Sequence, residues 1–158
     1  MLVRSIAEAV ERAYTAFADQ RLPDRIDFSP SKSRRKAVDA IRSVPLRQLG
    51  AEQLSHYAFC AMTTVGDVVA YRHFLPRILE VAAQGVREVG LEPELIAGKL
   101  VYGGWRGWCG DRQAAVTDLF ESAFWQSVDM PIEDDGRIEN WLTGMAVAGL
   151  PLYDALNA

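Results

Sequence analysis

Cysteine and histidine are scarce in this sequence, which limits the chemistry that it can support. The chain contains two cysteines, Cys60 and Cys109, and two histidines, His56 and His73, among 158 residues. Two thiols make no disulfide framework, and a domain of this size folds without one. We therefore expect reduced thiols and a cytoplasmic location.

Long apolar runs are missing as well. Even the apolar stretch of residues 65–83 is interrupted by polar and charged side chains, whereas a membrane-spanning helix needs about 18 or more apolar residues. The first residues also lack the basic leader and apolar run of a secretory signal, since Glu8 and Glu11 lie within them. The sequence thus predicts neither membrane association nor secretion.

The composition is that of an ordinary globular chain, with 49% hydrophobic and 24% charged residues. The net charge is −4, but residues 21–47 carry +5 and residues 111–158 carry −7. Because the whole chain is acidic, we expect no nucleic-acid partner, and the basic run 32–36 is interpreted as a solvated helix face. The acidic end is predicted to dock on a basic protein through Glu133, Asp134 and Asp135.

Apolar side chains recur every three or four residues along most of the chain, a spacing typical of amphipathic helices. No run alternates apolar and polar residues as a strand would. The sequence predicts an all-α fold in a single domain, residues 1–158, with about seven helices in an irregular (orthogonal) bundle or a short stack. The absence of a repeat of fixed period favours the bundle. The predicted helices cover residues 2–20, 33–43, 51–63, 67–82, 93–101, 111–130 and a last segment that ends at Gly149.

Local signals set the limits of these helices. Residues 21–30 hold two prolines and indicate a loop, packed by Ile26 and Phe28. Pro76 lies inside the fourth helix, so we expect a kink or two abutting helices there. Side chains that can cap a helix N-terminus precede three segments: Ser31 or Ser33, Asp67 and Asp111.

A cluster of unusual residue types spans the fourth predicted helix and the turn before it. It consists of Thr63-Thr64-Val65-Gly66-Asp67 followed by Tyr71-Arg72-His73-Phe74-Leu75-Pro76-Arg77. This segment resembles one in a family of uncharacterised bacterial proteins, in which a Thr-Thr-x-Gly-Asp motif precedes an aromatic-basic-His-Phe-Leu-Pro-basic run. The resemblance covers residues 45–85 and, more loosely, residues 141–156. It implies a helical fold and carries no activity.

Two interpretations of this cluster are open. Its polar members could bind an anion at a helix terminus, with His73 as an acid or base near neutral pH. Alternatively they serve the fold, by capping the helix, by pairing with Glu80, and by binding the carbonyl groups that Pro76 frees. We favour the structural interpretation, because such caps and pairs are common. The candidate ligand-binding residues here are Asp67, Tyr71, Arg72, His73 and Arg77.

A glycine-aromatic loop, residues 102–111, is the second candidate site. Its tryptophans, Trp105 and Trp108, could line a small-molecule pocket together with Tyr71, Arg72 and His73. The loop lacks the lysine and the preceding strand of phosphate-binding loops. Tryptophans in such a loop more often anchor it to the core, which is the interpretation we favour.

Metal binding and nucleophilic catalysis have little support. His56 and Cys60 lie four residues apart, which permits chelation or a nucleophile–base pair, but no second pair of ligands is close in sequence. We favour a buried thiol and hydrogen-bonded histidines. No serine, threonine or cysteine lies in a nucleophile motif. The sequence therefore predicts no cofactor and leans against an enzyme.

The leading functional hypothesis is a protein-interaction or adaptor module. It would hold its partner through a face near Pro76 or through the acidic C-terminal helices. A small-molecule-binding protein or hydrolase, with a pocket near residues 71–77 and 105–108, is the first alternative. An antidote-type protein that binds a toxic partner is the second. The oligomeric state is left open.

Overall fold

The protein is all-α, as the sequence predicts. The computed structural model describes residues 5–131 and 136–157, and within them it contains eight α-helices, two short 3-10 helices and isolated β-bridges in place of strands. The first seven α-helices match the seven predicted ones, and the eighth is the short turn after Pro151. The α-helices are α1 (Ile6–Ala16), α2 (Lys32–Arg42), α3 (Ala51–Cys60), α4 (Val68–Ala83), α5 (Pro93–Tyr102), α6 (Gly110–Val128), α7 (Arg137–Ala148) and α8 (Tyr153–Leu156). The 3-10 helices are η1 (Leu46–Gln48) and η2 (Trp105–Gly107).

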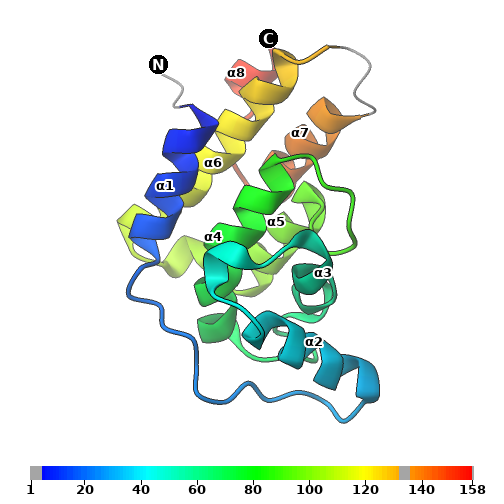
Figure 1. Cartoon of the computed structure of the whole chain (residues 1–158). Helices are drawn as coiled ribbons and strands as arrows, with labels where there is room; N and C mark the ends of the chain where they lie inside the picture. The colour runs from blue at the N-terminus through cyan, green and yellow to red at the C-terminus, as the bar shows by residue number, and fades with distance from the viewer. Residues whose placement is uncertain (1–4, 132–135, 158) are drawn as a thin grey trace. The chain divides into compact units, whose positions relative to one another are not determined.

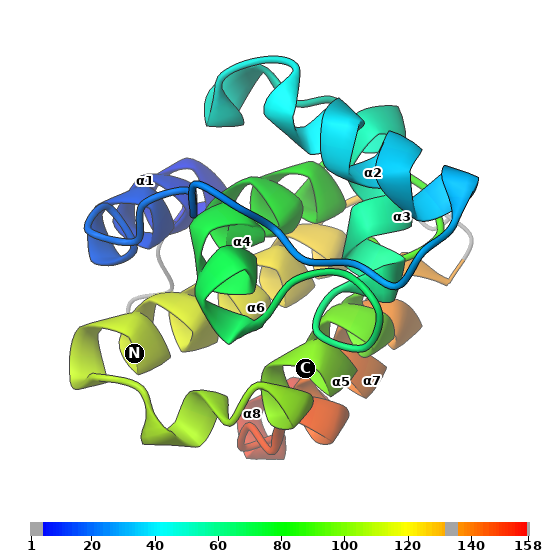
Figure 2. The same cartoon turned by 90° about the horizontal axis from the view of Figure 1, so that it is seen from below.

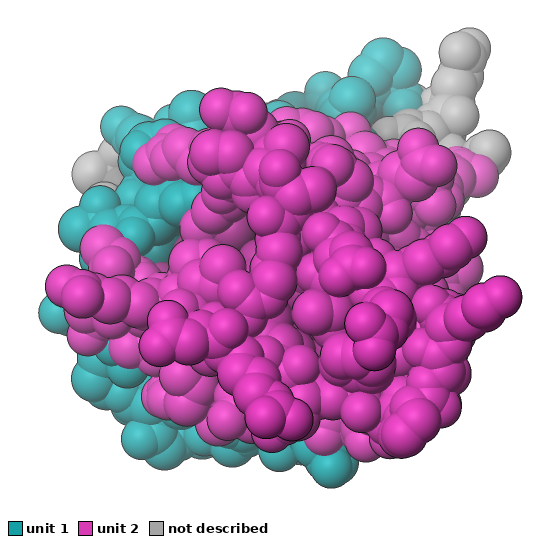
Figure 3. Space-filling view, turned by 60° about the horizontal axis from the view of Figure 1, so that its bottom comes forward, with its two compact units in different colours: residues 1–16, 93–158 teal, residues 17–92 magenta. Residues whose placement is uncertain are grey.

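The chain divides into two compact units, which Figure 3 shows in different colours. Unit 1 contains residues 1–16 and 93–158, and unit 2 contains residues 17–92. Each has buried apolar side chains along its helices, as amphipathic spacing requires. That the whole chain forms a single domain stays a prediction.

In unit 1, α5 packs on α7, α7 packs on α6, and α6 packs on α1, the N-terminal helix (Figures 1 and 2). The α5–α7 contact is close because Gly144 has no side chain: a Cβ there would lie 2.9 Å from Pro93 Cβ. Arg12 and Asp118 form an ion pair that joins α1 to α6. An edge-to-face contact between Phe120 and Trp141 joins α6 to α7.

In unit 2, α2 packs on α3 and α3 packs on α4 (Figure 2). The segment 17–31 runs past α4 before α2 begins, and the carbonyl oxygen of Gln20 accepts a 2.7 Å hydrogen bond from Nδ1 of His73 on α4. Arg77, one turn further along α4, donates from Nε to the carbonyl oxygen of Leu49 at 2.7 Å. These contacts tether the irregular parts of unit 2 to α4.

The helix starts agree with sequence reasoning at two caps and differ at one. Ser31 accepts a hydrogen bond from the Arg34 amide, and Asp67 accepts one from the Ala70 amide, so both cap their helices as predicted. The sixth helix begins at Gly110, with Cys109 at the cap position, two residues before the predicted cap. The predicted cap, Asp111, is therefore the second residue of that helix.

Three further expectations about helix boundaries are corrected. The first helix ends at Ala16 and not at residue 20. The third ends at Cys60, because the Cys60 carbonyl oxygen accepts bonds from the amides of residues 63, 64 and 65 and so turns the chain. Pro76 is buried within one continuous α4, so the alternative of two abutting helices is wrong. Within the described residues no helix is both long and apolar enough to cross a membrane.

Candidate functional site

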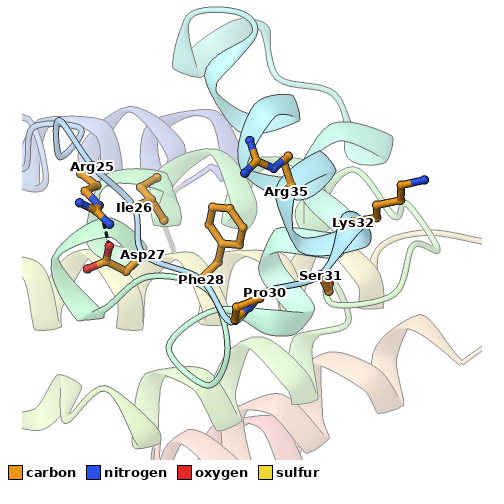
Figure 4. Close-up of a pocket in the computed structure, with 8 residues that line it drawn as sticks. All are labelled: Arg25, Ile26, Asp27, Phe28, Pro30, Ser31, Lys32 and Arg35. Atoms are coloured by element: carbon orange, nitrogen blue, oxygen red, sulfur yellow. Dashed lines mark ion pairs between the residues drawn. The ribbon is translucent and has the colours of Figure 1, made fainter.

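One candidate site is an open hollow in unit 2, between the irregular segment 25–30 and the start of α2. We call it the basic groove. Its volume is about 570 Å³. It is lined by Arg25, Ile26, Asp27, Phe28, Pro30, Ser31, Lys32 and Arg35 (Figure 4).

Backbone hydrogen bonds to the turn before α4 hold one wall of the groove in place. The Gly66 amide donates to the Asp27 carbonyl oxygen at 2.7 Å, and the Ser29 amide donates to the Thr64 carbonyl oxygen at 3.0 Å. Ile26 is 5% exposed, and its side chain lies over Gly66, where a Cβ would be 3.2 Å from Ile26 Cγ2. The segment 25–30 is therefore held in a fixed position by the turn before α4.

The first turn of α2 forms the other wall. Ser31 ends the irregular segment, and its hydroxyl accepts from the Arg34 amide at 3.1 Å. This cap sets the direction of α2 and places Lys32 and Arg35 beside the groove. Arg42, at the end of α2, also donates to the Pro23 carbonyl oxygen at 2.6 Å, so the chain is held just before the segment 25–30 as well.

An aromatic ring lies between the two walls. Figure 4 shows Phe28 rising from the segment toward the Arg35 side chain, with the Arg35 guanidinium carbon 5.9 Å from the ring centroid. That distance is at the outer limit of a cation–π contact. Phe28 is half-buried, so part of its ring is open to a ligand.

The charge of the groove is positive. Arg25 and Asp27 form a 2.9 Å ion pair at its edge, and both side chains are more than four-fifths exposed. Lys32 and Arg35 are exposed and make no ion pair within the described part of the chain. The groove thus offers two uncompensated cations next to an apolar surface, a combination suited to binding an anion that carries apolar groups.

The residues predicted around the fourth helix lie together in unit 2, but most of their polar groups serve the fold. Asp67 caps α4, with Oδ1 3.0 Å from the Ala70 amide. His73 and Arg77 tether the segment 17–31 and Leu49, and Arg77 also pairs with Glu80 at 2.7 Å, as predicted. Arg72 is half-buried on the same helix. A ligand-binding role for these residues stays a prediction.

His73 differs from expectation in what it binds. It contacts the Gln20 carbonyl oxygen and not a carbonyl that Pro76 frees. Because a carbonyl oxygen only accepts, Nδ1 of His73 carries a proton in this contact. Tyr71 is 1% exposed, and burial raises the pKa of its hydroxyl, so it stays neutral and does not open to a ligand.

The two tryptophans of the glycine-aromatic loop lie in unit 1. Trp105 is 1% and Trp108 is 8% exposed, which agrees with the interpretation that they anchor the loop to a core. The Arg106 guanidinium covers the Trp105 ring at 4.2 Å and donates to the Gly149 carbonyl oxygen at 2.5 Å. The pocket predicted from these tryptophans together with Tyr71, Arg72 and His73 stays a prediction.

Cys60 is less buried than the buried thiol that we favoured. His56 is exposed on α3 and Cys60 is half-buried. No group of three or more His, Cys, Asp or Glu side chains that could hold a metal ion occurs in the part of the chain that the structure describes. The predicted partner-binding residues Glu133, Asp134 and Asp135 lie outside the described residues.

Comparisons with protein-family models, with curated proteins and with solved structures found no match. The resemblance noted for residues 45–85 therefore stays a prediction.

The basic groove was not predicted from the sequence, although two of its features were. We identified the excess charge of residues 21–47 and the packing role of Ile26 and Phe28, but we interpreted the basic run as a solvated face. The groove forms because residues 27–29 bond to residues 64–66, a pairing that no periodic pattern indicates. The signal that the sequence offered for this groove was an aromatic residue between two prolines, next to a run of positive charge.

Proposed function

We propose that this chain is a protein-interaction module whose docking surface is the basic groove of unit 2. The observation that carries the proposal is the uncompensated pair of cations, Lys32 and Arg35, beside the half-buried ring of Phe28. Arginine and aromatic side chains are enriched in protein interfaces, and arginine is common among the few residues that carry most of the binding energy.

The contents of the groove favour binding over catalysis. Ser31 is its one hydroxyl, and that oxygen already accepts from the Arg34 amide and contacts the Ser33 hydroxyl at 3.1 Å. The groove lining includes no histidine, cysteine or lone carboxylate that could act as a base, since Asp27 is paired with Arg25. Recognition is the role that these side chains support.

A protein partner also fits the charge better than a nucleic acid does. Binding an extended nucleic acid depends on many phosphate contacts and on a broadly basic surface. This chain has a net charge of −4, and residues 111–158 alone carry −7. A short docking segment can use the local positive charge of the groove without approaching the acidic parts of the chain.

Charge reversal in the groove tests the proposal with a matched control on the same helix. Arg35→Glu removes a groove cation, whereas Lys36→Glu makes the same change beside a different hollow, lined with Asp39 and Glu52. The parent protein and both variants are immobilised separately and incubated with a lysate of the organism in which the protein naturally occurs. We expect a protein that the parent and Lys36→Glu retain and that Arg35→Glu loses.

Site-specific cross-linking makes this result independent of charge. A photo-reactive residue in place of Lys32 should cross-link to the same retained protein, and the same residue in place of Lys36 should not. Circular dichroism and thermal melting confirm that each variant folds. Equal retention by both charge variants, or cross-linking from position 36 alone, would show that the groove is not the docking surface.

A further inference from the structure

We infer that the groove takes an acidic segment of its partner, with Asp or Glu carboxylates at the Arg35 side and an apolar side chain against Phe28. This inference rests on the proposed function and adds the chemistry of the partner and its direction in the groove. It is carried by the asymmetric arrangement of charge along the groove.

The two ends of the groove differ in charge. At the α2 end, Lys32 and Arg35 are exposed cations without an ion-pair partner among the described residues. Figure 4 shows Lys32 extending away from the ring and Arg35 lying over it, so the two cations occupy different positions around this end. The first turn of α2 adds the positive end of a helix dipole, which favours a carboxylate there.

At the other end, Asp27 changes what the groove accepts. Its carboxylate and the Arg25 guanidinium neutralise each other, and both are exposed at the edge. A second carboxylate placed there would meet a like charge and would have to compete for Arg25. The anionic positions of the bound segment therefore lie toward α2, and a neutral or basic position lies toward Asp27.

The apolar surface of the groove sets the third requirement. Phe28 is half-buried and Ile26 is almost fully buried behind it. A bound leucine, methionine or aromatic side chain would cover the open part of the ring, whereas a purely acidic chain would leave it in water. A segment with acidic residues on the α2 side of one apolar residue, and a neutral or basic residue on the Asp27 side, matches all three features.

Asp27 provides the sharpest test, because its removal should strengthen binding. The probe is a fluorescein-labelled peptide, Gly-Glu-Glu-Leu-Glu-Glu-Gly, whose acidic residues on both sides of leucine place one pair near Asp27. It is titrated with the full chain in an anisotropy assay at low and high salt. Asp27→Asn should tighten binding about two- to five-fold, since it removes a like charge and releases Arg25. Arg35→Gln should weaken binding about tenfold, and Lys36→Gln should leave it nearly unchanged.

The same assay tests the apolar contact and the ligand class. Phe28→Leu keeps an apolar side chain and should bind several-fold more weakly because the ring is lost, while a peptide with Ser in place of Leu should bind the parent several-fold more weakly. A lysine-rich peptide and a single-stranded oligonucleotide of equal length should bind poorly. Higher salt should weaken the acidic peptide, because the contact is exposed and electrostatic.

The outcomes separate this inference from the proposed function. If Asp27→Asn weakens binding, or if the acidic peptide binds no better than the lysine-rich one, the assigned partner chemistry is wrong. Capture that still depends on Arg35 would then leave the groove as a docking surface for another kind of segment. Tighter binding of the oligonucleotide than of the acidic peptide would overturn both.

Discussion

Replacing Gly66 with alanine should destabilise unit 2 and weaken the basic groove together. Gly66 has φ +64°, in the left-handed region that costs a residue with a side chain roughly 1–2 kcal/mol. A Cβ at this position would also lie 3.2 Å from Ile26 Cγ2 and 3.3 Å from Ala70 Cβ, so neighbouring groups must shift. Together these effects predict a loss of about 2–3 kcal/mol in the free energy of unfolding.

A matched glycine separates backbone strain from close packing. Gly104 has nearly the same φ, +68°, but a Cβ there would meet no atom within 4 Å. Gly104→Ala should therefore cost only the strain, about 1–2 kcal/mol. Urea denaturation followed by far-ultraviolet circular dichroism measures both variants, and tryptophan fluorescence follows unit 1 separately, because all four tryptophans lie there.

The comparison can refute the reasoning in two ways. If Gly66→Ala costs no more than Gly104→Ala, Ile26 does not pack closely on the turn before α4. If Gly66→Ala lowers stability as expected but leaves binding of the acidic peptide unchanged, the anchoring of residues 26–29 does not shape the groove. Either result would remove the link that we draw between this turn and function.

Three further predictions, made with four substitutions, concern other parts of the structure. Burial, aided by two nearby aspartates, raises the pKa of the Glu121 carboxyl above its ordinary value of 4.5. The stability of the protein therefore falls as the pH rises from 4.5 through the raised pKa. Glu121→Gln removes this charge and should raise the stability at pH 7. The gain should vanish below pH 4.5 in urea titrations. Tyr57→Phe should leave stability unchanged or raise it by up to about 1–2 kcal/mol, because the buried hydroxyl has no hydrogen-bond partner among the described residues. A lower melting temperature for this variant would show that the hydroxyl does have a partner. Gly144→Ala should lower the free energy of unfolding by about 1–3 kcal/mol, because its Cβ would press on Pro93. Gly98→Ala, whose Cβ would lie in open space on α5, should raise it by about 0.5–1 kcal/mol. Equal effects of the two variants in denaturation would contradict the close α5–α7 contact.

The helices were predictable because their causes are local. Apolar spacing of three or four residues and caps such as Ser31 and Asp67 act within one or two turns, and both caps are present as predicted. The last helix likewise ends at Gly149 as predicted, where the glycine has a left-handed conformation. These features depend on neighbours in the sequence and not on the rest of the fold.

The errors lie where distant parts of the chain decide the outcome. His73 was expected to serve the carbonyls that Pro76 frees, but it binds Gln20, which is 53 residues away in sequence. Cys60 was expected to be a buried thiol, but it is half-buried at the end of α3. Periodicity identifies a stripe of apolar residues, and it does not say which polar residues at its edge find partners.

The basic groove combines both kinds of information. Its cations come from a local run in α2 that the sequence shows plainly, while its aromatic wall depends on contacts between residues 26–29 and 64–66. A charged run by itself is compatible with a solvated helix face. Phe28 lies beside that run, and its ring together with the cations of α2 makes a candidate binding surface.

Anchoring of the irregular wall also explains how so small a surface could bind a partner. Ordering one residue of a free loop costs about 1–2 kcal/mol, so five mobile residues would cost roughly 5–10 kcal/mol on binding. The bonds from Gly66 and Ser29 order this wall before a ligand arrives, which leaves the contacts of Arg35 and Phe28 to appear as affinity. Two classes of variant should therefore behave differently. Loosening the wall with Ile26→Ala should reduce stability and binding together, whereas Arg35→Gln should reduce binding and leave stability unchanged.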